Sequence, residues 1–312
     1  PQSPVPATRR LATLQPFDYI IPQDFAEASA LLAAGDGSVR AFQGGTDLII
    51  RMRSGTLKPA RVVDLKHLPG MQEIALSDDG WLVIGAACTM NQVGLHAAVR
   101  DHYGVLAEGC NSVASYQLRN RATIGGNLCN ASPAADAAPA LLCLEAVAEI
   151  HGPGGVHRVP VNEFFTGPGR TVLQGGEFLI GVHLPPVAGS SAGAYHKLGR
   201  TKIGDISMVS VAVHCVTSGD AATWRIAIGA AGPTPLRARQ AERALAEDAS
   251  PEGVARAAEL VSQAAQPIDD IRGSAAYRRA MVRVLARRGI EKVLAGLVPA
   301  GEPTAPLAGG PA

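Results

Sequence analysis

The residues from Ala122 to Glu145, ATIGGNLCNASPAADAAPALLCLE, carry the strongest structural signal in this chain. Thr123-Ile-Gly-Gly-Asn127 predicts a tight turn, because two adjacent glycines reach backbone angles closed to other residues and leave N–H groups uncovered. Asp136 follows in the first turn of an Ala- and Leu-rich run that predicts a helix. N–H groups ahead of a helix suit an anion. For a single Gly-Gly turn, a sharp strand–helix connection that binds nothing is the more common case, so a ligand site needs a second, matching loop.

A second turn of the same kind lies about eighty residues earlier. Gln43-Gly-Gly-Thr-Asp47 follows a predicted strand at Val39–Phe42 and precedes a predicted helix, with Thr46 or Asp47 as its cap. Each loop is expected to offer several unpaired N–H groups, so together they suit a ligand with two phosphates. Neither has the GxGxxG spacing and no Walker lysine follows, which disfavours a Rossmann or P-loop site.

Size and composition limit the classes of function. With 312 residues, 47% of them apolar, the chain is expected to form two or three compact units. Aromatic residues make up only 4%, so the core must consist of Ala, Val, Leu and Ile. A net charge of +1 provides no field for nucleic acid or an anionic membrane. We find no apolar run that could span a bilayer and no signal peptide, and we expect a cytoplasmic protein.

The cysteines do not have the spacing of a metal or iron–sulfur site. No two of them are separated by two residues, and their odd number argues against a disulfide framework. We therefore expect buried, reduced thiols and no metal in this chain. The five are Cys88, Cys110, Cys129, Cys143 and Cys215.

The chain divides at a change of composition. The stretch Pro185–Gly193, PPVAGSSAG, predicts a linker between two units. The first unit covers 16–186, with lobes at about 16–56 and 57–186, and the second covers 194–298. The second unit is predicted to have three strands, at Ala194–Leu198, Met208–Thr217 and Thr223–Gly229, and then helices. Residues 1–15 are predicted to be a flexible leader and 299–312 a disordered tail.

Three segments together resemble the flavin-binding medium subunit of molybdenum hydroxylases, the family of xanthine dehydrogenase and carbon monoxide dehydrogenase. They are QGGTDLIIRMRSG, RNRATIGGNLCNASPAADAAPALL and YHKLGRTKIGDISMVSVAV, and the likeness runs from about Asp18 to Leu297. The resemblance implies an α+β fold. A two-lobed FAD-binding domain of vanillyl-alcohol-oxidase type would be followed by a C-terminal domain of three antiparallel strands plus a helical bundle.

The resemblance also implies which residues bind FAD. The first pyrophosphate loop would be Ala41, Phe42, Gln43, Gly44, Gly45, Thr46, Asp47 and Leu48, and the second Thr123, Gly125, Gly126 and Asn127. Asp136 would fix the flavin side of FAD, so that Asp136→Ala weakens flavin binding with little effect on the fold. Leu179 would contact the ring region through its backbone.

Two further residues belong to the flavin end. Lys197 would lie near the ring, where a cation favours the anionic reduced flavin. By residue type alone, Lys197 also fits a solvated lysine at a strand edge. Tyr195 is one candidate for the aromatic residue that shields the ring.

The implied function is electron transfer inside a larger oxidoreductase. Electrons would pass from iron–sulfur clusters on a small subunit, through FAD here, to an external acceptor, because flavin links one-electron and two-electron chemistry. A large subunit would carry the molybdenum cofactor, and the assembly would be a dimer of heterotrimers. FAD would be the only cofactor of this chain, which needs no catalytic residue of its own.

Two other functions stay open. A self-contained flavin oxidase or reductase would need its own acid or base above the ring, and the short C-terminal domain argues against a large substrate cap. A scaffold that has lost FAD is difficult to reconcile with two intact glycine loops.

Overall fold

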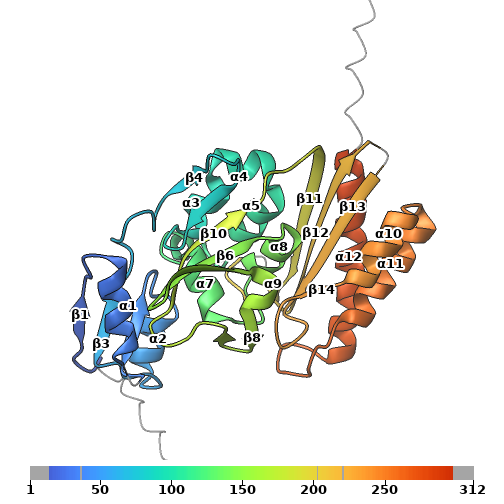
Figure 1. Ribbon diagram of the computed structural model, residues 1–312. Coiled ribbons are helices and arrows are strands. Elements are labelled where there is room, and N and C mark those ends of the chain that lie inside the picture. Colours follow the sequence, from blue (N-terminus) through green and yellow to red (C-terminus); the bar gives the residue numbers. More distant parts are fainter. Residues whose placement is uncertain (1–13, 36, 202, 220, 298–312) are drawn as a thin grey trace, which may run out of the picture.

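The computed structural model describes residues 14–35, 37–201, 203–219 and 221–297. All but the last two residues of the predicted leader, and the whole predicted tail, lie outside the described residues. The described chain mixes helices and strands in the predicted order, so the α+β class is confirmed (Figure 1). No helix in these ranges combines the length and the apolar character that crossing a membrane requires.

A small parallel sheet forms the N-terminal lobe. β1 (Asp18–Ile20) and β2 (Val39–Phe42) both pair with the central strand β3 (Arg61–Asp64). Parallel neighbours need crossover connections, which α1 (Phe25–Ala33) and α2 (Leu48–Arg53) supply. The lobe boundary predicted at 56/57 is therefore wrong, because the last strand in sequence is the middle strand of the first sheet.

An antiparallel sheet of five strands forms the second lobe, in the order β4-β5-β10-β6-β7. Its strands are β4 (Ile74–Leu76), β5 (Leu82–Gly85), β6 (Val147–Gly152), β7 (Gly155–Pro160) and β10 (Phe178–Leu184). Between β5 and β6 the chain forms α3 (Met90–Leu95), α4 (Ala97–His102), α5 (Gly104–Asn111), α6 (Tyr116–Arg119), α7 (Ile124–Asn130) and α8 (Ala137–Cys143). A short segment after β7 holds α9 (Val161–Phe164), β8 (Phe165–Gly167) and β9 (Arg170–Thr171).

The C-terminal unit has an antiparallel sheet in the order β11-β12-β13-β14. The strands are β11 (Ser190–Leu198), β12 (Val209–Ser218), β13 (Ala221–Gly229) and β14 (Leu236–Arg237), followed by α10 (Arg239–Glu247), α11 (Pro251–Ala264) and α12 (Ala275–Leu297). The three long strands were predicted. The fourth, β14, was missed because a two-residue strand after Gly232-Pro-Thr-Pro235 leaves no periodic pattern. Part of the predicted linker, from Ser190, belongs to β11.

This last sheet is covered on both faces. α5 and α8 of the first unit pack on one face and α10 to α12 on the other (Figure 1). Along β12 the side chains alternate between two cores: Ala212 belongs to the first and Val211 and Val213 to the second. A strand buried on both faces becomes an almost continuous apolar run, as Val209–Val216 is.

The predicted burial of the thiols is present at four of the five cysteines, whereas Cys129 is half-buried. Burial raises the pKa of the Cys110 and Cys143 thiols to about 12, so they stay protonated at neutral pH.

Candidate functional site

One cavity of about 330 Å³ collects most of the residues predicted to bind FAD. The first glycine loop, the second glycine loop and the start of β10 all contribute to its wall. Thirteen of the fifteen predicted residues line it: Ala41, Phe42, Gln43, Gly44, Gly45, Thr46, Asp47, Leu48, Thr123, Gly125, Gly126, Asn127 and Leu179. The other two, Asp136 and Lys197, lie outside the wall.

The conformation of the first loop is fixed by Gly45 and the ring beneath it. Gly45 has φ +73°, and a Cβ atom added there would lie 2.4 Å from the Phe42 ring. The Lys66 ammonium lies 4.2 Å from the centre of that ring. Only glycine combines this backbone angle with this close approach.

The first loop presents free backbone donors. Among the described residues, none accepts a hydrogen bond from the N–H groups of Gly44, Gly45, Thr46 or Asp47, and chain bonding resumes where Ile49 donates to the Gly45 carbonyl at 3.0 Å. The predicted side-chain cap is wrong, since Asp47 at the N-cap position makes no cap bond. Four consecutive N–H groups in the wall of a cavity form a concave site for an anion.

The second loop differs from the first. Gly125 donates its N–H to the Ala86 carbonyl at 2.8 Å, and Gly126 donates to the Thr123 hydroxyl at 3.0 Å, which caps α7. The expectation of several unpaired N–H groups in this loop is therefore wrong. Glycine at 125 serves the packing of the chain, because a Cβ atom there would lie 2.6 Å from the Ala86 oxygen.

The two loops are nevertheless in direct contact. The Thr123 hydroxyl donates to Gln43 Oε1 at 3.1 Å. A Cβ atom at Gly44 would overlap the Arg121 carbonyl oxygen, just before the second loop. The predicted pairing of the loops around one site is thus present in the geometry.

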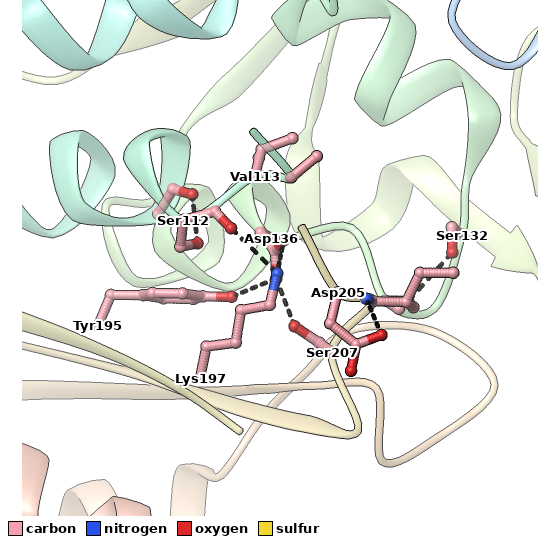
Figure 2. A network of polar contacts seen from close by, with 12 residues as sticks. Ser112, Val113, Ser132, Asp136, Tyr195, Lys197, Asp205 and Ser207 are labelled. Carbon is pink, nitrogen blue, oxygen red and sulfur yellow. Dashed lines mark hydrogen bonds and ion pairs between the residues drawn. The ribbon is translucent and has the colours of Figure 1, made fainter. Parts of the chain in front are cut away.

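Asp136 and Lys197 form a buried polar network beside the cavity (Figure 2). Asp136 Oδ1 accepts from the Tyr195 hydroxyl at 2.8 Å and the Ser207 hydroxyl at 2.5 Å. Asp136 Oδ2 accepts from Lys197 Nζ at 2.7 Å, and the same ammonium donates to the Ser112 carbonyl at 3.0 Å. The Lys197 side chain is only 15% exposed, so its interpretation as a solvated lysine is wrong.

The network lies directly behind the cavity wall. Val113, which follows Ser112, is itself part of that wall. Tyr195 is 7% exposed, its hydroxyl donates to Asp136, and it does not belong to the cavity wall. Burial, and then the negative charge of Asp136, raise the pKa of Tyr195 well above its ordinary value.

Sequence reasoning missed several residues of the wall. Arg40 and Arg51 line the cavity, and within the described part of the chain neither forms an ion pair with a carboxylate. Arg51 stands one helical turn after Asp47, a spacing that could have revealed it. The apolar Val113 and Leu118 also line the cavity, and no local pattern marks them.

The composition of the wall fits FAD. Backbone N–H groups without an acceptor, and arginines without a carboxylate partner, among the described residues suit a diphosphate. Apolar side chains such as Leu179, Val113 and Leu118 suit a flat ring. Within the described ranges, no group of three or more His, Cys, Asp or Glu residues could hold a metal ion.

Two family models match the chain. Residues 15–187 match the FAD binding domain in molybdopterin dehydrogenase, and residues 193–293 match the CO dehydrogenase flavoprotein C-terminal domain. A putative xanthine dehydrogenase FAD-binding subunit of Escherichia coli K12 is 34% identical over 268 residues, which are 85% of this chain and 91% of that protein. The carbon monoxide dehydrogenase medium chain of Hydrogenophaga pseudoflava is 31% identical, covering 88% and 96%.

Solved structures agree with these sequence matches. A chain of CO dehydrogenase from Oligotropha carboxidovorans superposes with a TM-score of 0.86 at 30% identity, over 91% of this chain and 99% of that one. A chain of quinoline 2-oxidoreductase from Pseudomonas putida 86 gives a TM-score of 0.84 at 28% identity, again over 91% and 99%.

Proposed function

Because this chain belongs to the FAD-binding medium subunits of the molybdenum hydroxylase family, we propose that it is the electron-transfer flavoprotein of such an enzyme. The resemblance found in the sequence is thereby confirmed, and the chain is an oxidoreductase subunit. It takes electrons from iron–sulfur clusters on a partner subunit and passes them through FAD to an external acceptor. The molybdenum cofactor also resides on a partner.

The observation that carries the proposal is the convergence of both glycine loops on one cavity, whose wall includes four residues with N–H groups that no described residue accepts from. The N–H groups from Gly44 to Asp47 would hold the pyrophosphate. Arg40 and Arg51 would balance its charge. When bound, FAD supplies both one-electron and two-electron chemistry.

The flavin end of the cavity would be enclosed by apolar residues and supported from behind. Leu179, Val113 and Leu118 would exclude water from the ring. Asp136 and Lys197, whose carboxylate oxygen and ammonium nitrogen lie 2.7 Å apart, would support the flavin end of the cavity from behind. Through Ser112, the Lys197 ammonium fixes the position of the wall segment that includes Val113.

The partners follow from the kind of enzyme. Relatives are described as the medium chain or FAD-binding subunit of a dehydrogenase, so this chain would assemble with a large and a small subunit. We extend the proposal to a dimer of heterotrimers in the cytoplasm.

Purification of the complex under native conditions tests the proposal. We expect one FAD per copy of this chain, with molybdenum and iron on two co-eluting chains. A flavin-loaded chain that turns over a small substrate alone would instead support the self-contained oxidase or reductase. A chain that purifies with its two partners but carries no FAD would refute the cofactor assignment.

A further inference from the structure

The side chain of Gln43 occupies the junction of the two glycine loops. Gln43 belongs to the first loop and lines the cavity. Its Oε1 accepts from the Thr123 hydroxyl of the second loop at 3.1 Å. A Cβ atom at Gly125 would lie 2.8 Å from the same oxygen, so the amide lies against the second loop.

The Gln43 amide is turned with its oxygen toward Thr123. The Thr123 oxygen accepts from the Gly126 N–H at 3.0 Å, and its single hydroxyl proton is given to Gln43. The amide oxygen of Gln43 therefore accepts a hydrogen bond from within the chain, whereas its NH₂ group remains available as a donor. No residue that the structure describes accepts from this Nε2, which is not fully enclosed by protein.

A free amide donor in this position complements the backbone donors. The N–H groups of Gly44, Gly45 and Thr46 come from the residues directly after Gln43 and have no acceptor among the described residues. The second loop, in contrast, has already used the N–H groups of Gly125 and Gly126. Of the backbone N–H groups of the second loop, only that of Thr123 lacks an acceptor among the described residues, so a ligand with two phosphates still needs a further donor on this side.

We propose that the Gln43 side chain supplies that donor: its NH₂ group binds the pyrophosphate of FAD, and its carbonyl oxygen anchors the amide to Thr123. This inference rests on the proposed function, because it names a ligand of the same FAD. It makes Gln43 a direct phosphate ligand through its side chain, and it couples the spacing of the two loops to the presence of a diphosphate.

The substitution Gln43→Glu isolates this role, because glutamate has the same shape and keeps an oxygen to accept from Thr123. It replaces the NH₂ donor by a negatively charged oxygen that faces the phosphates. We expect FAD to bind on the order of tenfold more weakly, or worse, at about pH 8, measured by quenching of FAD fluorescence with the flavin-free chain. At about pH 5.5 the difference in FAD affinity between the variant and the wild type should become smaller. The nearby phosphate raises the pKa of the glutamate, and protonation of the carboxylate restores a donor.

The matched control is Gln240→Glu, which makes the same charge change on the exposed face of α10. It should leave FAD affinity unchanged at both pH values. Melting temperature reports on the fold of each variant. If Gln43→Glu does not fold, Gln43→Met, which removes the donor and adds no charge, should still bind FAD several-fold more weakly than wild type.

The outcomes separate this inference from the proposed function. Equal FAD affinity of wild type and folded Gln43→Glu at both pH values would overturn the role of Gln43 and leave the FAD site intact. A pH-independent loss would mean that the side chain only positions the loops, and this also overturns the inference. Failure of the wild-type chain to bind FAD would refute the proposed function itself.

Discussion

At the scale of single residues, Asp136 joins the two units of the molecule. It stands before α8 in the first unit, and it accepts hydrogen bonds from Tyr195 and Lys197 on β11 and from Ser207 before β12. Removal of such a carboxylate destabilises the folded state, because its hydrogen-bond donors stay buried without an acceptor. The expectation that Asp136→Ala has little effect on the fold is therefore revised.

We predict that Asp136→Ala lowers the free energy of unfolding by about 3 kcal/mol, since it leaves the largely buried Lys197 ammonium uncompensated. Urea unfolding measures this. The control is Asp18→Ala, which removes a 78% exposed carboxylate lying 3.9 Å from Arg61 and should change stability by less than about 0.5 kcal/mol. Equal losses in the two variants would contradict the assigned role of the network.

At the scale of elements, the glycine loops have different functions despite their similar sequences. In the first loop, which follows the end of β2 and turns over the Phe42 ring, four N–H groups have no acceptor among the described residues. The second bonds to Ala86 and Cys88 just after β5, and it begins α7. The anion site is therefore mainly a property of the first loop.

Alanine at Gly45 tests the first loop. Gly45 and Gly55 both have φ +73°, but a Cβ atom meets the Phe42 ring at 45 and nothing within 4 Å at 55. Gly55→Ala should lower the free energy of unfolding only by the penalty of the left-handed backbone angle, about 1 kcal/mol. This variant should still bind FAD. Gly45→Ala should in addition displace the loop and lose most of the flavin absorbance per chain. Full flavin content in Gly45→Ala would contradict the phosphate role of the loop.

The strand β12 contains a histidine whose environment opposes protonation. His214 is 5% exposed, and its Nδ1 has no hydrogen-bond partner among the described residues. Burial, and then the positive charge of Arg225, lower the pKa of His214 from 6.5 to about 4, while Glu145 acts in the opposite direction. The native state therefore holds His214 neutral.

This pKa predicts a loss of stability in acid. The unfolded chain binds a proton to His214 near pH 6.5 and the native chain only near pH 4, so stability falls as the pH drops between these values. The full loss is about 3 kcal/mol. His214→Phe should remove this part of the pH dependence, measured by urea unfolding at pH values across the interval. An unchanged slope in His214→Phe would show that other groups cause it.

At the scale of the whole molecule, the core of the first unit extends into one face of the C-terminal sheet, while the other face belongs to a second core. Tyr195, Ala212 and Ala227 of the C-terminal sheet belong to the same buried cluster as the apolar residues of α5 and α8. Glu108 on α5 adds polar links, accepting from the Tyr195 N–H at 2.7 Å and from Lys292 on α12 at 2.6 Å. The two units, although separate in sequence, therefore pack against each other through apolar and polar contacts.

We predict that thermal unfolding of the full chain occurs in one cooperative transition, because neither unit can lose its structure without exposing part of the shared core. Calorimetry, with the calorimetric and van't Hoff enthalpies compared, measures this. Two transitions that resolve the FAD-binding unit from the C-terminal unit would contradict it.

Much of this organisation could be predicted from local sequence. The strands at Val39–Phe42 and Thr223–Gly229 and the long helix from Ala275 are present because alternation and helical periodicity act over a few residues. Thirteen of the fifteen proposed FAD residues line the cavity for a related reason. All of them except Leu179, which lies on β10, belong to the two loops whose glycines mark positions where the backbone turns sharply or approaches closely.

Local patterns in the sequence were thus enough to predict the order of the elements, the two loops and the family. Long-range packing determines which sheet receives β3, which N–H groups lack an acceptor among the described residues, and what surrounds Asp136. Each of these depends on partners far away along the chain, such as Ala86 for Gly125 and Ser207 for Asp136. A local pattern reports the conformation of a segment, whereas a free donor or a buried charge is defined by what folds against it.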